Sequence, residues 1–187
     1  MTIVLIVIGA IVFLVLVAFL LVFNHLVRLR NKTKNAWHQI DVQLKRRYDL
    51  LPEFARVVQG YAQHEKETFE SVTTARTQAM NESKVGEKGP AEDGLTGAIS
   101  SIFMVAENYP GLKADQEFRD FAKEIATTEN RIAGARKYYN GSVMYYENAC
   151  QGFPGNIVVK MMKNSFPTLD YFEMQDRALA AVPGVDL

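Results

Sequence analysis

Cysteine is almost absent from this chain of 187 residues, which contains Cys150 alone. A single cysteine excludes an intramolecular disulfide bond and a zinc site built from thiolates. Its place beside Ala149 in a helical stretch favours a small buried side chain over a nucleophile.

Histidine is also scarce, and the three that occur, His25, His38 and His64, lack the neighbours that metal sites need. None has a carboxylate three residues before it, as the Glu-x-x-His pairs of di-iron bundles require. His64 is followed four residues later by Thr68 rather than by the second histidine of a zincin. Phosphate-binding glycine loops and the Gly-x-Ser-x-Gly motif are missing as well. The sequence therefore predicts no metal, no cofactor and no catalytic residue.

Charge is missing from the first 27 residues, because all 21 basic and all 21 acidic side chains follow Val27. The apolar run Ile3–Phe23 is long enough to span a bilayer core of about 30 Å as a helix. A cleaved signal peptide would carry a basic start, a shorter apolar stretch and a small-x-small cleavage site. A buried core helix of this length would be unusual in so short a chain. We therefore expect residues 1–24 to form an uncleaved transmembrane anchor.

Basic residues collect directly after this run and predict its orientation. Because Arg28, Arg30, Lys32 and Lys34 all lie on its C-terminal side, the positive-inside rule places the N-terminus outside and the bulk of the chain in the cytoplasm. The same residues could contact anionic head groups at the membrane surface, or serve only as the topology signal. A neutral net charge argues against a nucleic-acid partner.

Helical periodicity extends through nearly all of the remaining chain, without an alternating strand pattern. The predicted fold is all-α: the transmembrane helix continues into an antiparallel bundle of three to four long helices. We expect the first helix to break at Pro52 and a linker to occupy 81–94, where glycine and proline cluster. The expected helices lie at about 25–50, 53–80, 95–107, 115–150 and 156–163, within a bundle spanning 25–173, and are followed by a polar tail at 174–187.

Two segments of the expected bundle, 35–52 and 127–140, are richer in polar residues than solubility requires. Antiparallel packing could bring Asp41 or Asp49 near Arg131 or Arg136, and could bring Glu129 near one of two neighbouring arginines, Arg46 and Arg47. Such a seam would fix the register of the helices, or alternatively form a ligand site. The candidate seam residues are Asn35, Trp37, Asp41, Gln43, Arg46, Arg47, Asp49, Pro52, Glu129, Asn130, Arg131, Arg136, Tyr139 and Asn140.

These polar segments also carry a family resemblance. The segments that carry it are 29–31 (LRN), 34–37 (KNAW), 39–47 (QIDVQLKRR), 60–62 (GYA), 64–65 (HE), 107–113 (ENYPGLK), 128–132 (TENRI), 135–136 (AR), 138–140 (YYN) and 153–154 (FP). On these segments the chain resembles the LemA family, in order, from about residue 24 to residue 173. It departs from the usual pattern of that family at 51–55 (LPEFA) and at 164–167 (NSFP).

The resemblance implies a small bacterial envelope protein with one membrane anchor and a helical bundle, here in the inner (cytoplasmic) membrane. Such proteins have no agreed biochemical activity, and their genes often neighbour membrane proteases of the HtpX type or TPM-domain proteins. Three functions follow as hypotheses. The first is a non-enzymatic, membrane-anchored scaffold or adaptor that binds or regulates another envelope protein. The second is a membrane-organising protein that binds the bilayer and a second copy of itself. A metal-dependent or hydrolytic enzyme is the least favoured.

Overall fold

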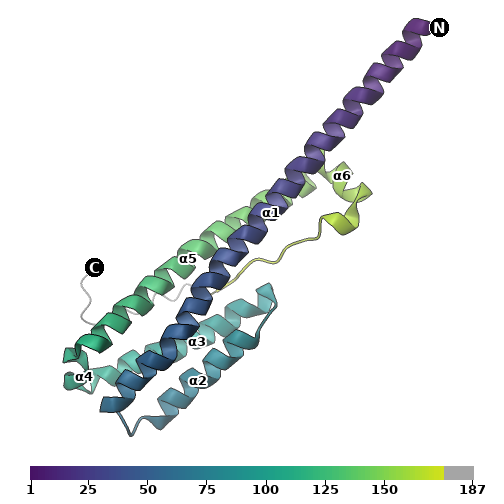
Figure 1. The fold of residues 1–187 in the computed structure, drawn as a ribbon. Coiled ribbons are helices and arrows are strands. Elements are labelled where there is room, and N and C mark those ends of the chain that lie inside the picture. Colours follow the sequence, from purple (N-terminus) through teal and green to yellow (C-terminus); the bar gives the residue numbers. More distant parts are fainter. Residues whose placement is uncertain (175–187) are drawn as a thin grey trace. The chain divides into compact units, whose positions relative to one another are not determined.

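The computed structural model describes residues 1–174, and in that range the chain is made of helices and short connections without a strand (Figure 1). The predicted all-α class is confirmed: a long apolar N-terminal helix is followed by a helical bundle. Of the predicted polar tail, only Met174 lies within the described residues. The elements are α1 (Thr2–Tyr61), α2 (Lys66–Asn81), α3 (Val85–Glu107), α4 (Pro110–Ala114), α5 (Gln116–Gln151), α6 (Gly155–Met161) and the 3-10 turn η1 (Lys163–Ser165).

The chain divides into two compact units, which are described separately. The first unit contains residues 1–38 and 138–169, and the second contains residues 39–137 with the segment that begins at Asp170. Both α1 and α5 contribute residues to each unit.

In the first unit, the N-terminal part of α1 is bare and the part that follows it is covered. Over its most apolar 18 residues α1 has a mean hydropathy of 3.5 and none of this stretch is buried, so it is long and apolar enough to cross a membrane. From Phe19 onward, α1 packs against a cluster built around Leu26, Tyr146, Val158 and Phe166. Tyr146 of α5, Val158 of α6 and Phe166, which directly follows η1, supply this cover.

In the second unit, α2 and α3 form a helical hairpin whose core is shared with α1 and α5 (Figure 1). The ring of Phe54 lies 5.5 Å from the ring of Phe103 and 5.5 Å from that of Phe118, measured between centroids. The buried stripe of α1 follows a helical period: Ile40 and Leu44, four residues apart, are both fully enclosed. Each such side chain stabilises the fold by about 1.5–3 kcal/mol relative to an exposed one.

The predicted helix break at Pro52 is wrong, because α1 continues through this proline to Tyr61. A proline has no N–H to donate to the carbonyl four residues earlier, which here belongs to Tyr48. The Nε of Arg76 in α2 donates to that carbonyl at 2.8 Å. A side chain from the neighbouring helix thus replaces the missing backbone bond, and the second helix begins at Lys66 rather than at residue 53.

The predicted linker at 81–94 is also wrong, because α3 begins at Val85 and includes Pro90. Gly89 in this stretch allows the backbone of Glu173 to approach closely, because a Cβ at this position would lie 1.7 Å from the carbonyl oxygen of Glu173. In addition, Lys88 is buried and donates to the carbonyl of Ala79 at 3.2 Å. Tertiary contacts therefore hold as helix a segment whose composition is typical of a loop.

The remaining helix boundaries agree closely with the sequence. Helix α5 runs from Gln116 to Gln151 where 115–150 was expected. Helix α6 occupies Gly155–Met161 and is followed by η1, where one short helix at 156–163 was expected. A five-residue helix, α4, replaces part of the expected turn before α5.

Candidate functional site: a buried polar cluster

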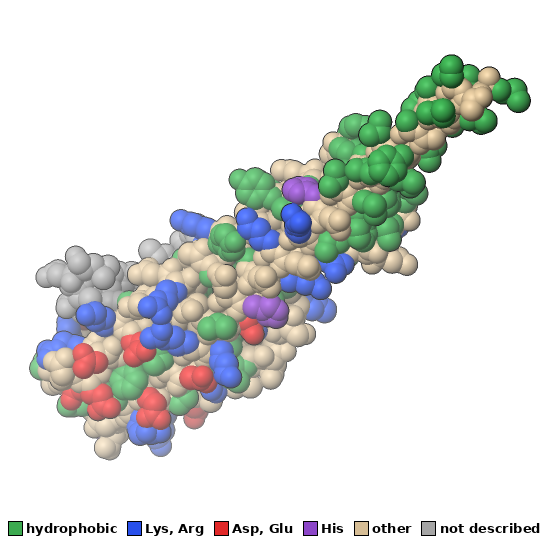
Figure 2. All heavy atoms as spheres, turned by 45° about the horizontal axis from the view of Figure 1, so that its top comes forward, with side chains coloured by type: hydrophobic (Ala, Val, Ile, Leu, Met, Phe, Trp, Pro, Cys, Tyr) green, Lys and Arg blue, Asp and Glu red, His purple; other side chains and the backbone are tan. Residues whose placement is uncertain are grey.

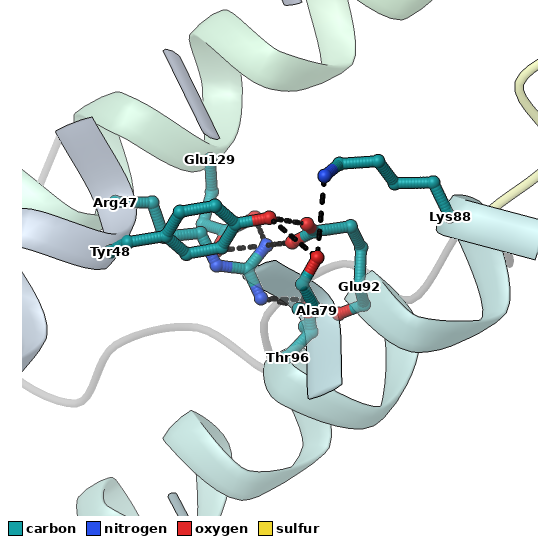
Figure 3. A network of polar contacts seen from close by, with 7 residues as sticks. All are labelled: Arg47, Tyr48, Ala79, Lys88, Glu92, Thr96 and Glu129. Atoms are coloured by element: carbon teal, nitrogen blue, oxygen red, sulfur yellow. Dashed lines mark hydrogen bonds and ion pairs between the residues drawn. The ribbon is translucent and has the colours of Figure 1, made fainter. Parts of the chain in front are cut away.

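Six polar side chains from three helices meet inside the second unit. We call them the polar cluster (Figure 3). Five of them, Arg47, Tyr48, Lys88, Glu92 and Thr96, are at most 7% exposed, and the Glu129 side chain is 14% exposed. The members are Arg47 and Tyr48 from α1, Lys88, Glu92 and Thr96 from α3, and Glu129 from α5.

Arg47 is the centre of the polar cluster and contacts two carboxylates. Its Nη1 lies 3.0 Å from Oε1 of Glu129 and 3.6 Å from Oε2 of Glu92. Its Nη2 donates to the hydroxyl of Thr96 at 2.9 Å and to the backbone carbonyl of Glu92 at 3.2 Å. One guanidinium thus joins α1 to both α3 and α5.

Around this centre, Tyr48 binds Glu92 and Lys88 binds the end of α2. The Tyr48 hydroxyl donates a short hydrogen bond to Oε1 of Glu92 (Figure 3). Lys88 donates to the carbonyls of Ala79 and Glu82, at 3.2 and 3.0 Å. The last carbonyls of a helix have no partner within the helix, so Lys88 caps α2 while its charge complements the negative end of the helix dipole.

Burial dominates the electrostatics of the polar cluster. Removal from water raises the pKa of Glu92, and the nearby Arg47 guanidinium offsets only part of that rise. Burial likewise raises the pKa of Glu129, against the same arginine. The pKa of Tyr48 is raised by burial and by the Glu92 carboxylate, so its hydroxyl stays protonated and acts as a donor.

The chemical groups of the polar cluster are directed at one another. Two cations, Arg47 and Lys88, oppose two carboxylates, Glu92 and Glu129, and the tyrosine supplies a neutral donor. Among residues 1–174, no group of three or more His, Cys, Asp or Glu side chains is placed to hold a metal ion. Arg47 Nε, Glu92 Oε2 and Glu129 Oε1 have no hydrogen-bond partner in the described part of the chain. The arrangement is that of an internal electrostatic joint between helices.

The structure brings some of the expected seam residues of the second unit together and leaves others apart. Glu129 pairs with Arg47, one of the two arginines expected beside it, whereas Arg46 pairs with Glu124 at 2.6 Å. Arg136 donates from Nη1 to the carbonyl of Met174 at 2.9 Å, rather than to Asp41 or Asp49. Gln43 is half-buried, while the exposed seam candidates are Asp41, Asp49, Pro52, Asn130 and Arg131.

The seam residues of the first unit form a smaller contact. The rings of Trp37 and Tyr139 meet edge to face with centroids 5.3 Å apart. Close by in this unit, Thr33 is buried and its hydroxyl donates to the carbonyl of Ser142 at 3.1 Å. Asn35 is exposed and Asn140 is half-buried.

The four basic residues expected at the membrane surface are of two kinds. Arg28, Lys32 and Lys34 are exposed, and the Nζ of Lys32 lies 5.7 Å from the centroid of the Tyr138 ring. Arg30 is half-buried, and its Nη1 donates to the carbonyl of Ser165 at 2.6 Å. Three of the four are therefore available to a membrane surface, and Arg30 also ties α1 to η1.

Four of the six members of the polar cluster, Tyr48, Lys88, Glu92 and Thr96, are not among the seam residues that the sequence predicts. Lys88, Glu92 and Thr96 were assigned to a linker or to the start of a helix, so their burial was not foreseen. Their spacing of four residues does carry a signal, because residues at i, i+4 and i+8 share one face of a helix. Glycine and proline in the same stretch concealed that signal.

Together, the apolar helix and the bundle with a buried ionic joint define a class: helical-bundle proteins whose N-terminal helix is long and apolar enough to cross a membrane. Within this class the chain belongs to the LemA family, whose model matches residues 36–187. The LemA family is not a known family of enzymes, and membership supports a non-enzymatic helical protein.

Three curated relatives are similar to the chain. Protein LemA of Metamycoplasma hominis is 29% identical over 144 residues, covering 74% of this chain and 64% of the relative. Magnetosome proteins MamQ 1 and MamQ 2 of Paramagnetospirillum magneticum are each 21% identical over 177 residues, covering 81% of this chain. The chain spans 64% of the length of each of these relatives.

Proposed function

We propose that this chain is a non-enzymatic scaffold or adaptor, anchored by α1 in the bacterial inner (cytoplasmic) membrane, whose bundle binds or regulates another envelope protein. The observation that carries the proposal is the composition of α1. One helix supplies both a fully exposed apolar stretch at its N-terminal end and, through Arg47, the centre of the buried polar cluster. The second unit is therefore covalently continuous with the apolar stretch, and a partner bound to that unit would be held at the membrane.

The polar cluster supports a structural rather than a catalytic role for the charged residues. A catalytic acid or base has to reach a substrate, within hydrogen-bond distance or through one water. Glu92 is fully buried and already accepts from Tyr48, and Glu129 is paired with Arg47. By family resemblance only, an HtpX-type membrane protease or a TPM-domain protein is the partner to examine first.

Photo-crosslinking from the bundle surface tests the adaptor function. A benzophenone amino acid at Val42 or at Met104, each 63% exposed, replaces an apolar side chain that faces solvent. After irradiation in intact cells, we expect one discrete adduct, identified by mass spectrometry and recovered at a fixed ratio to the chain. The same probe at exposed Gln59 is the matched control. A monomer without any adduct at both apolar positions would contradict the proposal.

The second candidate is a self-associating, membrane-organising protein, and the exposed basic residues favour it. Arg28, Lys32 and Lys34 are free to contact anionic head groups, each worth about 1 kcal/mol near the surface. Replacing these three with Gln, while retaining Arg30 for its bond to Ser165, should disperse fluorescent foci of the tagged protein. Unchanged foci in that variant count against this candidate.

A further inference from the structure

One surface of the first unit, which we call the α6 surface, is apolar and exposed although it lies outside the candidate membrane span. Phe153 is 83% exposed, Ile157 49% and Met161 70%. Ile157 and Met161 are one helical turn apart in α6, on a different side from Gly155 and Val158, which are buried. Lys160 and Lys163 are exposed in the same segment. Such a mixture of large apolar and basic side chains is typical of segments that lie in a membrane interface.

The α6 surface is fixed to one particular stretch of α1, residues 19–23. Val158 and Phe166 belong to the cluster that packs against Phe19, Val22 and Phe23 of α1. The rings of Phe23 and Phe166 meet edge to face, with centroids 5.5 Å apart. The start of α6 also packs closely against the end of α5, because a Cβ at Gly155 would lie 1.9 Å from the carbonyl oxygen of Ala149, and it would lie 3.7 Å from Leu26 Cδ2 of α1.

This stretch of α1 also lies where the membrane boundary is expected. A bilayer core of about 30 Å takes about 20 helical residues, and the uncharged apolar run of α1 ends at Phe23. Residues 19–23, about 6–7 Å of helix, are thus both the last turn of the span and the contact site of α6 and η1. Interfacial helices bury their apolar face about 5–10 Å into the boundary between head groups and acyl chains. The length of α1 that contacts α6 therefore matches the depth to which interfacial helices insert.

We propose that Phe153, Ile157 and Met161 insert into the lipid interface beside α1, so that α6 is a second membrane contact of the protein. Lys160 and Lys163 supply charge complementary to anionic head groups. In Figure 1 the turn between α5 and α6 lies at the end of this unit from which the apolar part of α1 projects, as this contact requires. Figure 2 shows hydrophobic side chains continuing from the projecting helix onto the adjoining part of the unit, with basic side chains beyond them.

This inference rests on the proposed anchoring of α1, and one experiment separates the two. The full-length protein carries a single tryptophan, Trp37, which is first replaced by Phe to keep its ring contact with Tyr139. A new tryptophan is then placed at Met161, or at Ile157 in a second variant. Each protein is reconstituted into vesicles of phosphatidylcholine and phosphatidylglycerol that carry no bromine, bromine on the upper acyl chain, or bromine near the chain ends. The last of these reports on position 13, which lies about 15 Å from Phe23 in the middle of the core.

Two control positions calibrate the quenching. Phe13→Trp lies in the apolar run and reports whether α1 is in the bilayer. Tyr138→Trp lies in the same unit beside Lys32, nine residues beyond Phe23, or about 13 Å further along α1. We expect about a twofold loss of fluorescence at positions 157 and 161 in brominated vesicles, and almost no loss at position 138.

Each result has a distinct meaning. Quenching at position 13 without quenching at 157 or 161 would overturn the interfacial role of α6 and leave the anchor intact. If, in addition, the emission at 157 and 161 shifts to the blue as protein density in the vesicles rises, the α6 surface contacts a second copy of the chain instead of lipid. An unquenched tryptophan at position 13 would contradict the anchor itself, and with it this inference.

Discussion

Arg47 shows how a single residue can decide the packing of three helices. It is 1% exposed, and its guanidinium is shared by two carboxylates from different elements. Burying charges costs several kcal/mol per ion after relaxation, and their mutual attraction offsets this cost only when the partners stay together. The intact polar cluster therefore need not add much to the free energy of unfolding. Removing any one member, however, should destabilise the fold strongly.

Replacing Arg47 with Met should destabilise the second unit by about 3–5 kcal/mol, because Glu92 and Glu129 would be left buried without their shared cation. Chemical denaturation in detergent, followed by circular dichroism, measures this loss. Arg56→Met is the matched control on the same helix: its pair with Glu53 is exposed, and the change should stay within about 0.5 kcal/mol. Equal effects of both substitutions would contradict the role given to Arg47.

The raised pKa values of Glu92 and Glu129 predict a pH dependence with a definite sign. In the folded protein burial raises both pKa values above that of an exposed glutamate, about 4.3. The folded state then binds these protons more tightly than the unfolded state, so stability falls as pH rises from about 4.3 through the folded pKa. Glu92→Gln should flatten this slope in denaturation midpoints measured between pH 5 and 8. Glu87→Gln, exposed on the same helix, should leave it unchanged.

Tyr48→Phe tests the same slope from the opposite direction. The hydroxyl of Tyr48 donates to Glu92 and thereby lowers the pKa of that carboxyl. Without this donor the Glu92 pKa rises further, so the loss of stability with pH should extend to higher pH than in the unchanged protein. If stability stops falling at a lower pH in this variant, the Tyr48 hydrogen bond does not lower the pKa of Glu92.

At the scale of elements, Pro52 and Gly89 mark the largest differences between the predicted and the observed helices. Sequence periodicity placed the buried stripe of α1 and the ends of α5 well, because an amphipathic pattern reports burial directly. It could not foresee that Arg76 satisfies the carbonyl that Pro52 leaves without a partner. Nor could it foresee that Gly89 is required by the backbone of Glu173. Both devices depend on residues distant in sequence, which local patterns do not contain.

The same reasoning explains what was found of the polar cluster. Arg47 and Glu129 lie on strongly periodic helices, so their proximity follows once the helices are antiparallel. Glu92 lies in the stretch taken for a linker, and its role depends on that stretch being helical. An error about an element thus became an error about a site.

Arg76 and Pro52 should be energetically coupled. Arg76→Met leaves the backbone carbonyl of Tyr48 without its donor, which should lower the free energy of unfolding by about 1–3 kcal/mol. In the Pro52→Ala background the new N–H of residue 52 can bind that carbonyl, so the same Arg76→Met change should cost much less. A double-mutant cycle from denaturation curves measures the coupling, for which contacting residues typically give about 0.5–3 kcal/mol. Strict additivity would mean that Arg76 does not replace the missing backbone bond.

At the scale of the whole molecule, the sequence order of apolar and basic residues on α1 connects structure with location. The exposed apolar stretch is followed by Arg28, Lys32 and Lys34, all exposed. Basic residues within about 15–20 residues of a span resist translocation. With α1 as the proposed anchor, we expect these three side chains to determine its orientation and hence the compartment that contains the bundle.

Protease added to intact spheroplasts tests this orientation. With the basic side chains inside, the bundle should be protected until the membrane is permeabilised, whereas an epitope tag fused before residue 1 should be removed at once. Replacing Arg28, Lys32 and Lys34 with Gln and placing two lysines in the fused tag reverses the charge difference across the span, and a substantial fraction of the chains should then expose the bundle. Arg30 is kept in both proteins because it bonds to Ser165. Digestion of the unchanged bundle in intact spheroplasts would place it outside the cell membrane, and partners would then have to be sought on that side.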